Sequence, residues 1–321
     1  MPRLPAALCL ALALAARAGP ASAGEFAPAA NGATLARAFA LPALGEVAPP
    51  PRGRSQTRWT LDFVNEYVEE GDCAVECITL DGETARLRFA HRRSLGGGWD
   101  AGLELSWLDR GGGFLDGWIR DWHDAFGLPT GGRELAPDDR YRFRYERAGA
   151  VLLDETRGGS GLGDAVLTLG RRAGRTGMLR AMAKLPTGDD DALQGGNAGA
   201  ALWYERALHL PPRWHGYFAV GGSFNERGRV LRPMQNTAIA FGGVGVFAPV
   251  TATVGLTAQL NVHGRLYDGS ALSPLERAGM PLSLGLRLRA GASGVVELGF
   301  QEDPSVNGSP DFALYLSFRS L

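Results

Sequence analysis

The run Asp121-Trp122-His123-Asp124 holds the side chains best suited to catalysis in this sequence. A carboxylate beside an imidazole can orient a general base or ligate a metal, so Asp121, His123 and Asp124 are weak acid/base candidates. Short clusters of this kind are common in loops, and no Ser or Cys nucleophile is tied to this one by spacing. We therefore assign no catalytic residue, and an enzyme that uses His123 and Asp124 ranks last among the functions considered.

Two further motifs resemble ligand sites. The glycine-rich run at 158–164 has the composition of a phosphate-binding loop, but it lacks the G-K-[ST] ending and the strand-loop-helix setting. Asp189, Asp190 and Asp191 offer oxygen ligands of the kind that Ca²⁺ prefers, yet acids in an external loop are more often simply solvated. We expect no cofactor and no resident metal.

The first 23 residues have the three parts of a secretory signal peptide. Arg3 supplies the charge, residues 7–16 are apolar, and residues 21–23 (Ala-Ser-Ala) form a small-residue cleavage pattern. The apolar stretch breaks at Gly19 and Pro20, short of the ~20 residues that a membrane-spanning helix needs. We expect residues 1–23 to be removed and residues 24–56 to form an extended N-terminal segment in the periplasm.

Cys73 and Cys77 are the cysteines that remain after such cleavage, in a compartment where disulfides form. Two cysteines this close on one extended strand lie too far apart to bond, so a disulfide requires a turn between them. Without that turn they remain free thiols.

The overall charge gives no case for a nucleic-acid partner. Lys+Arg is 33 and Asp+Glu is 34, for a formal net charge of -1, whereas nucleic-acid binding needs concentrated positive charge. Hydrophobic residues make up 45% of the chain and charged residues 21%, a balance that excludes disorder.

Most of the mature chain alternates apolar and polar or small residues, the period of two that is typical of β-strands. Residues 233–264 contain no Asp, Glu, Lys or Arg, but Pro249 and the neighbouring glycines argue against a helix there. The alternation predicts strands at 57–68, 83–94, 99–108, 162–172, 177–185, 199–208, 214–224, 236–247, 251–264, 281–290, 294–301 and 311–318.

Strand length and loop asymmetry favour a membrane barrel over a soluble sandwich. A tilted strand crosses the bilayer with ~9–11 residues, and several predicted strands have that length. Every second connection is short, and the others are long or rich in Gly, Pro and charge, as in outer-membrane barrels. We predict an all-β fold in the cell outer membrane: a transmembrane antiparallel β-barrel of about 12 strands (range ~10 to ~14) over residues 57–321.

Residues 109–161 form one long extracellular loop that is too large to be only a connector. The apolar residues between Leu115 and Phe126 fall at helical spacing, and residues 141–145 alternate aromatic and arginine side chains as in a small hairpin. We expect this loop to dock over the extracellular mouth as a lid, with His123 near its inner surface. The alternatives are a plug inside the lumen and an aromatic face resting on lipid.

Three runs, at 111–134, 80–83 and 161–164, resemble an uncharacterised exported bacterial family known as domain of unknown function 3187. The resemblance spans most of the mature chain. It implies an envelope protein and supplies neither an activity nor catalytic residues. The Cys73 and Cys77 pair is not part of the family pattern.

The polar strand faces predict a barrel interior of mixed charge, which either lines water or pairs internally. The inward candidates are Arg86, Arg88, Arg287, Arg289, Asp62, Glu66, Asp100, Glu104 and Glu297. From the long loop, Arg133 and Glu134 are candidates for contact with a solute or with lumen charges. We expect a pore or transporter for small solutes that contacts outer-membrane lipid, and the pattern leaves an open and a plugged lumen as alternatives. A structural barrel that binds another envelope component ranks second.

Overall fold

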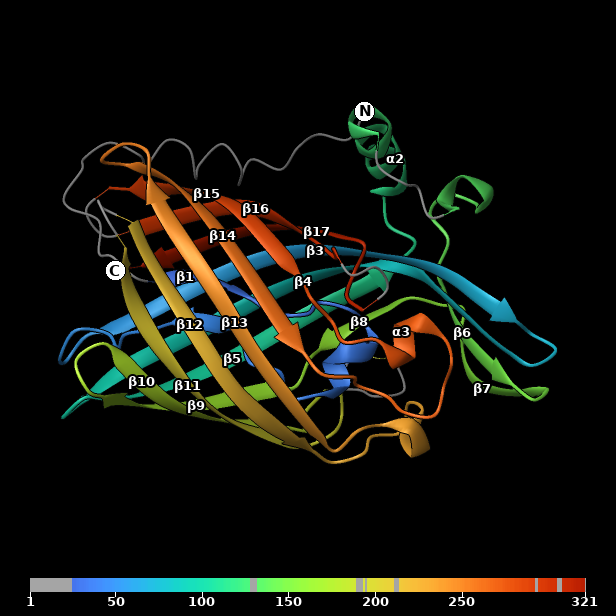
Figure 1. Cartoon of the computed structure of the whole chain (residues 1–321), viewed down its shortest axis with the longest axis horizontal. Helices are drawn as coiled ribbons and strands as arrows, with labels where there is room; N and C mark the ends of the chain where they lie inside the picture. Colours follow the sequence, from blue (N-terminus) through green and yellow to red (C-terminus); the bar gives the residue numbers. More distant parts are fainter. Residues whose placement is uncertain are drawn as a thin grey trace.

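Twelve strands close into a single antiparallel barrel (Figure 1). The computed structural model describes residues 25–127, 132–188, 193, 195–210, 214–291, 294–304 and 308–320, so the predicted signal peptide lies outside the described residues. The barrel strands are β3 (Ser55–Asp72), β4 (Glu76–Gly96), β5 (Trp99–Gly111), β9 (Ala165–Ala173), β10 (Gly177–Leu185), β11 (Gly199–Leu210), β12 (Trp214–Asn225), β13 (Ala238–Pro249), β14 (Val254–His263), β15 (Leu282–Ala290), β16 (Gly294–Glu302) and β17 (Phe312–Ser320). The ring closes where β17 pairs with β3, with Leu316 opposite Leu61. The prediction of a twelve-stranded membrane barrel is confirmed.

The period of two sorts the side chains between an outer and an inner surface. Trp59, Leu87 and Leu298 point outward and are 46%, 43% and 52% exposed. Arg58 and Asp62, which alternate with the outward residues of β3, are buried. An apolar exterior around a polar interior is the arrangement that a barrel in a membrane requires.

The connections are sorted by length between the two ends of the barrel, as predicted. Short turns join β4 to β5, β9 to β10 and β13 to β14 at one end. The other end, opposite the C-terminus in Figure 1, carries the hairpin β6 (Arg142–Arg147) and β7 (Ala150–Glu155), with α3 (Ser273–Glu276) and η3 (Arg232–Met234). The parity of the strands makes this the extracellular end.

The long loop contains the helix and the hairpin that its sequence predicts. The helix α2 spans Asp116–Phe126, a short turn η2 spans Arg133–Leu135, and β8 (Gly159–Leu162) pairs with β5 just before β9 begins. β6 extends the wall by pairing with the outer part of β4. Among the described residues, no helix is long and apolar enough to cross a membrane.

Cys73 and Cys77 form a disulfide at the tip of the β3–β4 hairpin. The turn that such a bond requires is present at residues 73–75, between the two strands. The bond therefore lies outside the membrane, at the extracellular end of the barrel.

Residues 25–50, which we call the plug, lie inside the lumen. β1 (Glu25–Ala29) and β2 (Leu44–Glu46) pair with each other in a separate two-stranded sheet, and η1 (Leu35–Ala38) lies between them. We expected residues 24–56 to extend into the periplasm, and for the plug this is wrong. Its apolar side chains, Phe26, Leu35 and Phe39 among them, find burial only within the barrel.

The plug enters the barrel as a hairpin from the periplasmic end. Its second arm leads to Ser55, which pairs with Arg93 beside the short β4–β5 turn. β1 runs antiparallel to β2, so the first arm returns toward the same end. Both ends of the plug therefore face the periplasm, and its tip at η1 lies toward the extracellular loops.

Candidate functional site in the plugged lumen

Glu46 of the plug lies among three arginines of the barrel wall. Its carboxylate oxygens are 3.4 Å from Nη1 of Arg58 and 2.9 Å from Nη1 of Arg92, and Nε of Arg180 donates to its backbone carbonyl at 3.1 Å. Arg92 and Arg180 also share Asp100, at 3.2 and 3.1 Å. Removing one partner from a buried ion pair typically costs ~3–5 kcal/mol, because the other charge stays buried. Glu46 is thus the main ionic link between the plug and the wall.

Polar side chains of the wall also satisfy the backbone of the plug. Gln259 donates to the carbonyl of Ala27 and Asn261 to the carbonyl of Ala29, both at 2.8 Å. At the tip, the Tyr267 hydroxyl donates to the carbonyl of Leu35 at 2.9 Å. The plug does not pair with a strand of the barrel, so these side chains supply the donors that its backbone carbonyls need.

Aromatic packing fixes the first arm of the plug at mid-lumen. The ring of Phe26 packs edge-on against Tyr217 of β12 with centroids 4.8 Å apart, and both side chains are fully buried. Gly45 allows this approach, because it adopts φ +105° and a Cβ there would lie 3.0 Å from Cβ of Phe26.

The tip of the plug closes the extracellular mouth through a cluster of apolar side chains. Leu35, Ala36 and Phe39 are buried against residues from the extracellular loops and strand ends. Those residues are Ile78, Leu80, Phe143, Tyr145, Leu153, Leu193, Leu231, Met234, Ile239, Leu266, Tyr267, Leu272 and Leu275. Hydrogen bonding adds to this closure, since Tyr145 donates to Glu76, and burial together with that carboxylate raises the pKa of Tyr145 to about 12.

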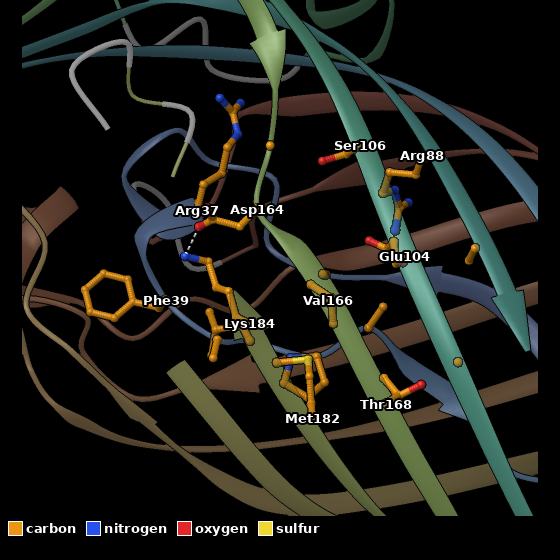
Figure 2. Close-up of a pocket in the computed structure, with 18 of the residues that line it drawn as sticks. Arg37, Phe39, Arg88, Glu104, Ser106, Asp164, Val166, Thr168, Met182 and Lys184 are labelled. Atoms are coloured by element: carbon orange, nitrogen blue, oxygen red, sulfur yellow. Dashed lines mark ion pairs between the residues drawn. The ribbon is translucent and has the colours of Figure 1, made fainter. Parts of the chain in front are cut away.

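Between the plug and the wall formed by β4, β5, β9, β10 and β11 remains a cavity of ≈ 160 Å³ (Figure 2). Its polar lining includes Arg37 from the plug and Arg88 and Glu104 from the wall. Lys184 and Asp164 face each other at one side of it as an ion pair. The volume is well above the ~10–15 Å³ that a single water needs, so the cavity has room for a small solute.

Every strand residue predicted to face inward does so. Asp62 accepts from Arg86 at 3.1 Å and from Arg88 at 2.9 Å, and Glu104 lines the cavity beside them. On the opposite side, Glu297 accepts from Thr257 at 2.9 Å and lies 3.7 Å from Arg287, and Arg289 lies toward the periplasmic turn. The alternation therefore places these charges on the lumen side of the wall, and their contact with a solute stays a prediction.

Helix α2 packs on the outer surface of the barrel and is not a lid. Trp118 contacts Phe312 with centroids 5.0 Å apart, Trp122 contacts Phe300 at 5.9 Å, and Phe114 contacts Phe63 at 5.6 Å. The three partner rings belong to the outward faces of β17, β16 and β3. The expectation that this segment covers the mouth as a lid is wrong, because the outer wall offers its aromatic stripe a large apolar surface.

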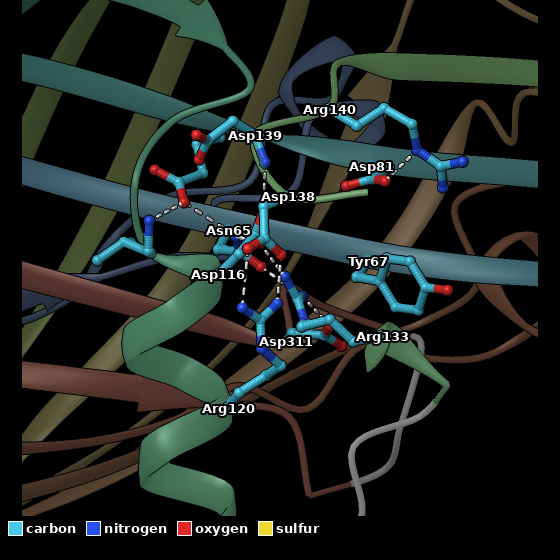
Figure 3. Close-up of polar contacts among 12 residues, drawn as sticks. Asn65, Tyr67, Asp81, Asp116, Arg120, Arg133, Asp138, Asp139, Arg140 and Asp311 are labelled. Carbon is cyan, nitrogen blue, oxygen red and sulfur yellow. Dashed lines mark hydrogen bonds and ion pairs between the residues drawn. The ribbon is translucent and has the colours of Figure 1, made fainter. Parts of the chain in front are cut away.

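A buried polar network holds α2 in this position (Figure 3). Glu83 accepts the backbone N–H groups of Phe114, at 2.9 Å, and of Leu115. Arg133 pairs with Asp116 at the start of the helix and with Asp311 at 2.9 Å. The prediction that Arg133 contacts the lumen is therefore wrong, because Arg133 anchors α2 on the outer wall. Glu134 beside it is exposed.

The exposed edge of this network behaves differently from its buried centre. Arg120 pairs with Asp138, whose pKa is lowered by that hydrogen bond, but the two side chains are 30% and 54% exposed. Exposed pairs contribute only ~0–1 kcal/mol. Arg133 and Asp116, with 4% and 6% exposure, are the contacts that hold the helix.

Two of the candidate acid/base residues, Asp121 and Asp124, do not reach the lumen. Asp121 and Asp124 are exposed on α2, and the side chain of His123 lies outside the described part of the structure. Neither described carboxylate faces the cavity, which lies on the inner side of the wall. Asp189, Asp190 and Asp191 also lie outside the described residues.

Sequence reasoning missed the residues that connect the plug to the wall. They are Glu46 of the plug and Arg58, Arg92, Arg180, Lys184 and Glu205 of the wall. It also missed Arg37 and Asp164, which line the cavity. The inward set could have included Arg58, Arg92 and Arg180 from the alternation alone. Nothing in the non-periodic stretch around Glu46 indicates that it enters the barrel.

The family model described as "Protein of unknown function (DUF3187)" matches residues 6–320. The chain belongs to this family. In this DUF3187 protein, the sequence runs that resemble the family contain residues that form hydrogen bonds. Glu83 and residues 113–116 meet under α2, and Asp164 accepts from the backbone N–H groups of Gly188 at 2.7 Å and Gly196 at 3.0 Å.

One solved structure shows the same fold as the DUF3187 chain, and a second is similar with a lower TM-score. The COG4313 outer membrane channel from Pseudomonas putida F1 is similar with a TM-score of 0.54 and 14% identity, over 86% of this chain and 98% of that one. The Ralstonia pickettii toluene transporter TbuX has a TM-score of 0.44 and 10% identity, over 92% and 98%. The first of these likenesses supports an outer-membrane barrel fold. No curated protein matches the sequence.

We predict that Arg133→Met releases α2 from the outer wall without opening the barrel. The substitution leaves Asp116 buried without its cation, a local loss of roughly 3–5 kcal/mol. Trypsin should then cut after Arg120 within α2, as located by mass spectrometry, while heat-modifiable migration on a gel is retained. The control is Arg142→Met, because Arg142 pairs with Asp154 at an exposed site. Equal protection of Arg120 in both variants contradicts the anchoring role.

Proposed function

We propose that this protein is a gated outer-membrane pore for small solutes, whose lumen is closed by the plug. The observation that carries the proposal is that the strands of the plug are not part of the hydrogen-bonded sheet of the wall. The wall is a complete ring of hydrogen-bonded strands, and β1 and β2 pair only with each other. Withdrawal of the plug therefore breaks side-chain contacts and leaves the ladder of the wall intact.

The hairpin form of the plug supports a reversible gate. Because both of its ends face the periplasm, the plug leaves without threading a chain end through the barrel. The wall behind it is lined by charged and polar groups, and such groups are readily hydrated once the plug is gone. A structural barrel that only binds another envelope component does not require a polar lumen or a plug that is separate from the wall.

The proposal places the protein in the outer membrane, after export to the periplasm. The exposed apolar outer face fits a bilayer, and the entry of the plug from the periplasmic end fits insertion of the barrel from the periplasm. Export through a cleaved signal peptide is part of the proposal. The intact mass of protein purified from membranes should correspond to a chain that begins at Gly24, and a mass that includes residues 1–23 would count against cleavage.

Deleting residues 26–50 should convert a silent or rarely conducting barrel into a steadily conducting one in planar bilayers. The deletion removes the plug and leaves every barrel strand in place. Deletion of 114–126 is the matched control, because it removes a segment of α2 that lies on the outer wall, and its conductance should equal that of the native protein.

Heat-modifiable migration must be retained in both deletions for the comparison to count. A folded 26–50 deletion that stays silent would overturn the pore. An increase in conductance on deleting residues 114–126 would instead show that the long loop, and not the plug, controls conduction.

A further inference from the structure

Arg37 at the tip of the plug has hydrogen-bonding capacity that the described residues do not use. Its Nη2 donates to the carbonyl of Gly32 at 3.2 Å, but its Nε and Nη1 are buried and have no acceptor among those residues. Burial and the like charges of Arg86 and Arg110 lower the pKa of Arg37 to about 10, and the charge of Glu66 acts against this shift. Buried polar groups are nearly always paired, so two nitrogens without an acceptor on one guanidinium indicate that Arg37 can bind a ligand that accepts hydrogen bonds.

Nearby acids of the wall and the plug are already engaged by other partners. Glu66 accepts from the backbone and the hydroxyl of Thr34. Asp62 is shared by Arg86 and Arg88, and Asp164 pairs with Lys184. Arg110 adds a further buried donor, since its Nη1 donates to Tyr141 at 2.8 Å while its Nε has no acceptor among the described residues. The tip of the plug thus lies in a region where positive charge is in local excess.

The cavity places an open volume directly beside Arg37. Arg37, Arg86 and Arg88 are part of its lining, and Glu104 lies near Arg88. In Figure 2 the Arg37 side chain extends away from the Lys184–Asp164 pair, so that pair does not neutralise it. A ligand at this end of the cavity meets a planar guanidinium, which suits the two oxygens of a carboxylate.

Away from the Arg37 guanidinium the lining mixes apolar side chains with polar ones, among them Thr168 and the Lys184–Asp164 pair. Phe39, Val166, Met182 and Trp203 are among the apolar ones, together with Leu108. Figure 2 shows Phe39, Val166 and Met182 on the side away from the Arg37 guanidinium. A ligand that satisfies both parts of the lining carries an anionic group at one end and a small apolar body at the other.

We propose that this cavity binds small organic carboxylates, with Arg37 as the residue that receives the carboxylate and Arg86 as its partner from the wall. This inference rests on the proposed function, because it assigns small organic carboxylates as the solutes of the proposed pore. Because Arg37 belongs to the plug and Arg86 to the wall, such a solute bridges the two. Binding at this point gives the solute a direct means of changing how firmly the plug is seated.

Isothermal titration calorimetry on the full-length barrel in detergent tests the site without requiring conduction. The probes are benzoate, benzamide and acetate: benzamide keeps the ring and removes the charge, and acetate keeps the charge and removes the ring. Benzoate should bind roughly tenfold or more tightly than benzamide, as expected for loss of a charge-assisted hydrogen bond. Acetate should bind more weakly than benzoate.

Arg37→Gln should lower the affinity for benzoate roughly tenfold and leave that for benzamide unchanged, and Arg86→Gln should act in the same direction. Arg265→Gln, at a side chain that is 52% exposed in a loop, is the matched control and should bind like the native protein. Equal affinity for benzoate and benzamide, or native affinity for benzoate in both variants, would overturn the site. The outcomes are separable from the pore: if the 26–50 deletion conducts and benzoate does not bind, only this inference falls.

Discussion

The ion pairs between Glu46 and the wall arginines are the interaction on which this structure depends. A lumen that gathers Arg58, Arg92 and Arg180 at one level needs negative charge there, and in the described part of the wall Asp100 and Glu205 pair with Arg92 and Arg180. Glu46 adds the missing charge from outside the wall. The wall therefore requires the plug for its charge balance, and the plug requires the wall for its burial.

This mutual dependence differs from the way the barrel itself is held together. The wall depends on backbone ladders and on an apolar outer face, which the bilayer stabilises whether or not the lumen is filled. The plug depends on side-chain contacts, each of modest free energy, such as the bonds from Gln259 and Asn261. A stable wall around a less stable filling is the energetic arrangement that a gate needs.

A feature could be predicted from the sequence when it depends on neighbouring residues, and not when it depends on residues far apart in the chain. Strand β10 was predicted at 177–185 and observed at Gly177–Leu185, because alternation is a local signal. The helix α2 was also predicted, but not its docking surface, since Phe63, Phe300 and Phe312 come from three strands. The plug was missed altogether: its partners come from strands far apart in the chain, and residues around Glu46 have no period of their own.

The central claim is that the charge of Glu46 keeps the plug in the lumen, and the conductance of Glu46→Gln in planar bilayers tests it most directly. The substitution keeps the size of the side chain and removes only the charge that faces Arg58 and Arg92. The account predicts openings that are much more frequent than in the native protein, with the same unit conductance as the barrel that lacks residues 26–50. A Glu46→Gln barrel as silent as the native one, when the plug-deleted barrel conducts, would contradict it.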